Sequence, residues 1–111
     1  MQSASAYSNR HKMNPYLVNE LTNATPAQQI MKVYDFAIVK CQKEDMIKTN
    51  EAIQVLIDCL NFTDEAAKPI SIGLFRLYQY CQEQMRKKNN KEVYKILSEL
   101  RDTWREALKN G

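Results

Sequence analysis

The chain contains only two glycines and three prolines among its 111 residues. Sheet proteins need many tight turns, and glycine and proline supply most of them. Residues that lose little rotamer freedom in a helix are abundant instead, including alanine, glutamate, glutamine, lysine, leucine and methionine. The sequence therefore predicts long helices with short connections, and its length suits a single domain.

Apolar residues recur every three or four positions in four segments, which is the period of an amphipathic helix. The expected helices cover residues 25–43, 45–61, 69–85 and 91–109. At the start of the first expected helix, Thr25 is the expected N-cap, Pro26 the first helical residue and Gln28 the partner in a capping box. Thr63 is the expected cap of one short extra helix. Asparagines near residue 89 suit a left-handed helix end.

Short connections make consecutive helices antiparallel neighbours. The predicted fold class is therefore all-α, an antiparallel up-down four-helix bundle. Residues 1–24 are predicted to form a flexible N-terminal arm, and residues 25–111 the bundle domain. The arm is rich in small polar residues, and its tyrosines Tyr7 and Tyr16 have no core of their own to join. They are either exposed or seated in an apolar groove on the bundle, with Leu21 as a further docking residue.

Catalysis and metal binding are not expected. General acid–base catalysis most often uses histidine, and the only one, His11, lies in the predicted arm. The cysteines Cys41, Cys59 and Cys81 are far apart in the sequence, whereas zinc ligands cluster. Each falls on an apolar helix row, where a thiol acts as a small hydrophobic group. We expect no enzyme activity, no metal and no cofactor.

The location of the protein follows from what the sequence lacks. No apolar run approaches the roughly 20 residues of a membrane span, and the N-terminal residues have no apolar signal segment. An odd number of cysteines without a signal peptide suits a reducing cytosol. We expect a cytoplasmic protein without membrane insertion.

Charge is uneven along the chain, whose net charge is +3. Residues 86–109 contain eight Lys or Arg and four Asp or Glu. This excess suits an acidic partner. Nucleic-acid binding through Lys87 and Lys88 is an alternative, but the segment lacks interleaved aromatics and a helix-turn-helix pattern. We expect no nucleic acid.

The second predicted helix has an unusually wide apolar face. A helix with so broad a face contacts two neighbours, or one neighbour and a ligand. A second apolar row, at Ala52, Val55 and Cys59, lies beside the main one. Tyrosine is the dominant aromatic residue and is enriched at protein interfaces. The candidate groove residues are Ile53, Leu56, Ile57, Leu60, Tyr34 and Tyr78.

Four ordered motifs resemble those of the FliS family, the bacterial flagellin-specific secretion chaperones. They are YLVNELTNATP at residues 16–26, KVYDFA at 32–37, LYQYC at 77–81 and LRDTWREA at 100–107. The second motif departs from the family in having Phe36 where a glycine is usual. The third helix also begins with EAAKPI at residues 65–70 in place of a Gly-Gly-Glu-Ile-Ala-like segment.

The resemblance implies a chaperone that holds the disordered C-terminal segment of flagellin, prevents premature polymerisation and passes flagellin to the flagellar type III export gate. Such a client would bind as a helix in an apolar groove. Tyr7, Tyr16 and Leu21 would then cap the groove when flagellin is absent. A generic helical adaptor with another client remains an alternative, and a homodimer stays open.

Overall fold

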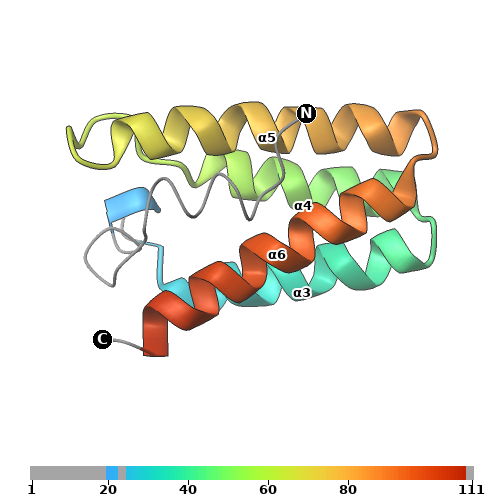
Figure 1. Cartoon of the computed structure of the whole chain (residues 1–111), viewed down its shortest axis with the longest axis horizontal. Coiled ribbons are helices and arrows are strands. Elements are labelled where there is room, and N and C mark those ends of the chain that lie inside the picture. The colour runs from blue at the N-terminus through green and yellow to red at the C-terminus, as the bar shows by residue number, and fades with distance from the viewer. Residues whose placement is uncertain (1–19, 23–24, 110–111) are drawn as a thin grey trace.

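The computed structural model describes residues 20–22 and 25–109 and contains four long helices. They are α3 (Ala27–Gln42), α4 (Met46–Asp58), α5 (Lys68–Arg86) and α6 (Asn90–Lys109). Each packs on the next, and α6 returns to pack on α3 (Figure 1). Figure 1 also shows α6 crossing the bundle diagonally, from the end of α5 toward the start of α3. The predicted fold class, an all-α up-down four-helix bundle, is confirmed.

The start of α3 differs from the predicted capping box. Pro26, with ψ at 135°, is the N-cap, and the helix begins at Ala27 without a side-chain cap. A proline ring fixes φ but leaves ψ free, so Pro26 can stand outside the helix as well as inside it. The Thr25 hydroxyl instead contacts the Cys59 sulfur at 3.8 Å. The predicted capping role of Thr25 is therefore wrong.

Side chains hold the connection between α4 and α5. The Asn61 carboxamide oxygen accepts hydrogen bonds from the backbone N–H and the hydroxyl of Thr63, at 2.9 and 2.7 Å. The Asp64 carboxylate accepts from the backbone N–H of Ala67 at 2.9 Å. Thr63 is therefore not the predicted cap, and residues 65–67 form a turn in place of the short extra helix.

Two similar turns lie at one end of the bundle. Glu44 after α3 and Lys88 after α5 have φ values of 59° and 62°. The N–H of the following residue, Asp45 or Asn89, bonds back to the carbonyl five residues earlier. These are Schellman helix ends, which usually place glycine in the left-handed position. The expectation of asparagine there is wrong for α5, because Lys88 takes the position one residue earlier.

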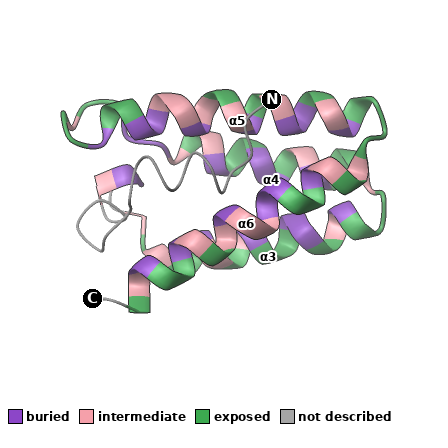
Figure 2. Cartoon of the chain, viewed as in Figure 1, coloured by how far each residue is buried: buried purple, intermediate pink, exposed green. Residues whose placement is uncertain are grey.

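A single core runs between the four helices (Figure 2). Tyr34 and Tyr78 lie at its centre and hydrogen-bond to each other through their hydroxyls. The Trp104 ring lies 5.9 Å from that of Tyr34, measured between centroids. Cys41 and Cys81 are buried as predicted, while Cys59 is half-buried.

Burial changes the acidity of three core groups. Desolvation, followed by the neighbouring Tyr78, raises the pKa of Tyr34 well above its ordinary value. Desolvation also raises the pKa of the Cys41 thiol to about 11. The pKa of Cys81 is raised by desolvation first and by Cys41 second. All three groups therefore stay protonated in the folded bundle at neutral pH.

This protonation predicts a loss of stability in alkali. The unfolded chain releases cysteine protons near pH 9.0 and tyrosine protons near pH 10.0, where the folded bundle still holds them. Stability should be intact below about pH 9 and fall as pH rises, by about 1.4 kcal/mol per pH unit for each group ionised only in the unfolded chain. Urea unfolding measured from pH 8 to pH 11 on Tyr34→Phe should show a shallower fall than the wild type.

The matched control is Leu56→Ala, which removes buried apolar volume without removing a titrating group. It should lower stability by a similar amount at every pH, by about 2–4 kcal/mol. A Tyr34→Phe profile parallel to that of the wild type would contradict the linkage.

Candidate binding surface

Most of the groove residues predicted from sequence lie inside the bundle. Ile57 is half-buried at the edge of the core. The other five are buried, and they are Ile53, Leu56, Leu60, Tyr34 and Tyr78. In this structure they hold the helices together, and their contact with a client stays a prediction.

The geometry of α4 explains this placement. Thr49, Ile53 and Leu56 recur at helical spacing and all point into the core. The row formed by Ala52, Val55 and Cys59 is rotated away from them along the same helix. Val55 is 45% exposed, while Ala52 is buried. Val55 is therefore the residue of the second row that adds to the exposed apolar surface of α4.

An apolar groove of about 310 Å³ lies between α3 and α4. Val33 and Phe36 line it from α3, and Ala52 and Val55 line it from α4. Charged residues stand at its edges, Lys32 on one helix and Glu51 on the other. We call it the α3–α4 groove.

Phe36 is the largest exposed side chain of the α3–α4 groove, with 47% of its surface open to solvent. The Lys40 ammonium lies 5.4 Å from the centre of its ring, which is a cation–π distance. A large exposed apolar side chain beside another on the next helix is typical of an interaction site. An apolar side chain of a partner helix could bury itself between Phe36 and Val55.

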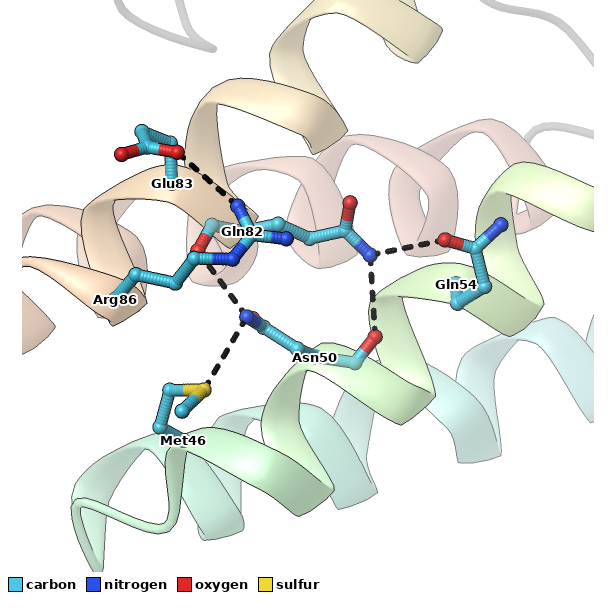
Figure 3. Close-up of polar contacts among 6 residues, drawn as sticks. All are labelled: Met46, Asn50, Gln54, Gln82, Glu83 and Arg86. Atoms are coloured by element: carbon cyan, nitrogen blue, oxygen red, sulfur yellow. Dashed lines mark hydrogen bonds and ion pairs between the residues drawn. The ribbon is translucent and has the colours of Figure 1, made fainter.

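The opposite side of α4 is closed by polar contacts with α5 (Figure 3). The Asn50 carboxamide donates to the Gln82 carbonyl at 3.1 Å, and the Gln82 carboxamide donates back to the Asn50 carbonyl at 3.2 Å. Gln82 also donates to the Gln54 side chain at 3.2 Å. These reciprocal bonds would have to break before a client could enter between α4 and α5, so that seam is the poorer entry point.

Leu21 is the only predicted cap residue within the described part of the chain. Its side chain is fully buried in the core, and its carbonyl accepts a hydrogen bond from the backbone N–H of Asn61 at 2.8 Å. The chain is thereby fixed to the connection between α4 and α5. Tyr7 and Tyr16 lie outside the described residues.

The sequence-based prediction missed Val33, Phe36 and Val55 as surface residues. Two signals could have found them. Val55 belongs to the second apolar row of α4, and Phe36 is a large apolar residue where the FliS pattern has glycine. Neither signal says which row faces the core, because that depends on where α3 and α5 lie around α4.

The described residues offer no grouping of three or more His, Cys, Asp or Glu that could hold a metal ion. Within the same ranges, 20–22 and 25–109, no helix has the length and apolar character needed to cross a membrane. Both Tyr34 and Tyr78, the tyrosines nearest the bundle centre, are enclosed by apolar side chains and by each other.

Comparison with known proteins identifies the family. The family model described as flagellar protein FliS matches residues 8–111. Comparison with curated proteins and with solved structures gives no significant match. The family match spans nearly the whole chain, including all four helices and both sides of the α3–α4 groove, so the chain belongs to the FliS family of flagellar secretion chaperones.

Proposed function

We propose that this protein is a cytoplasmic export chaperone for flagellin. It binds the disordered C-terminal segment of flagellin, prevents premature polymerisation and delivers the client to the flagellar type III export apparatus. The observation that carries the proposal is an open apolar groove on a fully packed bundle of the FliS family.

A disordered client loses conformational entropy when it binds, so it must gain apolar contact in return. The α3–α4 groove supplies such contact without unfolding the bundle, because Phe36 and Val55 are already exposed. Groove walls formed by two helices suit an amphipathic helix lying along them. The Lys32 and Glu51 side chains at the edges can pair with charges beside the client's apolar row.

The sequence-predicted residues have a supporting role in this proposal. Ile53 and Leu56 hold α4 against the core, which fixes where Ala52 and Val55 emerge. Ile57 is the exception, because it is half-buried and could touch a client from the α5 side. Substitutions at Phe36 and Ile57 therefore test two possible client sites separately, one on the α3 side of α4 and one on its α5 side.

The N-terminal residues are proposed to cover the client site when flagellin is absent. Leu21 anchors the chain to the bundle, and Tyr7 and Tyr16 precede this anchor in the sequence. Tyrosine suits this role, because its ring can be buried while its hydroxyl stays in water. Exposed apolar patches also favour aggregation, so a cover has a clear benefit.

The groove proposal predicts that Phe36→Glu weakens binding of the flagellin C-terminal segment by roughly tenfold or more, since a charge would have to be buried against the client. Isothermal titration calorimetry measures the affinity, and circular dichroism checks that the bundle remains folded. Because Phe36 is exposed, its substitution should change stability little.

The matched control is Ile47→Glu, which places the same charge on an exposed apolar residue of α4 outside the α3–α4 groove. It should bind flagellin like the wild type. Wild-type affinity in Phe36→Glu together with lost affinity in Ile57→Lys would move the client to the other face of α4. No binding of flagellin by the wild type would favour an adaptor with another client.

The cover proposal predicts that deleting residues 1–19 raises flagellin affinity about threefold to tenfold, because the client no longer competes with the arm. Leu21 is retained so that its core contacts survive. Calorimetry on the truncated and full chains measures the difference, and size-exclusion chromatography detects self-association. Equal or lower affinity in the truncated chain, with the bundle folded, would count against a cover.

A further inference from the structure

One end of the bundle carries the net positive charge of the protein. Residues 40–48 and 83–95 surround the two Schellman turns and contain eight Lys or Arg against four Asp or Glu. The rest of the chain has eight of the former and nine of the latter. The turns touch each other, since the Asn90 carboxamide donates to the Glu44 carboxylate at 3.4 Å. We call this region the basic end.

Most of these cations are available to a partner. Arg86 pairs with Glu83 at 3.1 Å, and both side chains are exposed (Figure 3). Within the described part of the chain, six exposed lysines of the basic end form no ion pair, and they are Lys43, Lys48, Lys87, Lys88, Lys91 and Lys95.

A hollow of about 620 Å³ opens between the two turns. Lys88 and Lys91 line it together with Tyr94, whose ring is partly exposed. Amide side chains complete the wall, among them Gln42 and Asn89. Glu44 also faces the hollow and accepts a hydrogen bond from Asn90, so the lining carries two lysine charges against one carboxylate. The lining therefore offers positive charge, amide donors and acceptors, and one aromatic ring.

Exposed apolar side chains lie at the same end of the bundle, outside the lining of the hollow. Ile47 in the first turn of α4 is 65% exposed, more than any other large apolar residue described. Its neighbour Met46 and the α3 residue Val39 are also exposed. Partners that are only charged leave such side chains in water, so the combination points to a partner with both acidic and apolar groups.

We infer that the basic end docks an acidic amphipathic protein segment, distinct from the client in the α3–α4 groove. Carboxylates of the segment pair with Lys88 and Lys91, and its backbone can hydrogen-bond to the amides of the hollow. Its apolar side chains cover Ile47 and Tyr94. Charge complementarity of this kind contributes mainly association rate and specificity.

Other anionic partners fit less well. Nucleic acid would use the lysines, but single strands need several aromatic platforms and the hollow exposes only Tyr94. An anionic membrane is a broad surface, to which the concave amides of Gln42 and Asn89 would contribute little. A protein segment uses the lysines, the amides and the apolar residues together.

The test uses a fluorescein-labelled helical peptide of about 16 residues with glutamate and leucine rows, and a twin with glutamine for every glutamate. Fluorescence anisotropy on the full chain should give roughly tenfold tighter binding of the acidic peptide, weakening as salt rises. Lys88→Glu with Lys91→Glu should weaken that binding roughly tenfold, and Ile47→Ser by roughly threefold.

The charge-matched control is Lys68→Glu with Lys109→Glu, at the opposite end of the bundle (Figure 1). It should leave peptide affinity within about twofold. Equal binding of the two peptides, or an equal loss in the control, would overturn the inference. Tighter binding of duplex DNA or of phosphatidylcholine vesicles containing phosphatidylserine, if lost in the Lys88 and Lys91 variant, would also overturn it.

Discussion

The number of neighbours that a helix can have in a four-helix bundle governs the rest of this structure. Each helix packs mainly on two others, so only part of its circumference can be buried. The apolar face of α4 is wider than that part. Ile53 and Leu56 take the inward positions, and Val55 is left outside beside Phe36 of α3. The apolar side chains that the core does not bury, Val55 and Phe36, line the α3–α4 groove.

The helices were predictable because they depend on local sequence. Apolar spacing located all four, Asp45 caps α4 through a 3.1 Å bond to the N–H of Lys48, and Pro69 lies in the first turn of α5. The errors came from degrees of freedom that local sequence does not fix. The ψ of Pro26 is one, and the choice of Lys88 for the left-handed position is another.

The site was predicted less well than the fold, and Tyr34 and Tyr78 show why. Tyrosine hydroxyls normally keep their rings at the edge of a core. Here the two hydroxyls bond to each other, so both rings can be fully buried without an unpaired polar group. That pairing joins α3 to α5 across 44 positions of sequence and leaves no local signal.

The surface divides into regions of different chemistry. The groove between α3 and α4 is apolar, the seam between α4 and α5 is closed by Asn50 and Gln82, and the basic end combines lysines with Ile47. The proposed client groove and the proposed docking site at the basic end are thus separate surfaces, so both proposed contacts could form at once.

The most direct measurement of the central claim is photocrosslinking from single positions of α3 and α4. Benzoylphenylalanine would replace Phe36, Ile57 or Ile47 in turn, and the folded protein would be irradiated with the C-terminal segment of flagellin. Position 36 should yield the dominant crosslinked product, with little from positions 57 and 47. Strong crosslinking from position 57 and none from position 36 would contradict the α3–α4 groove as the client site.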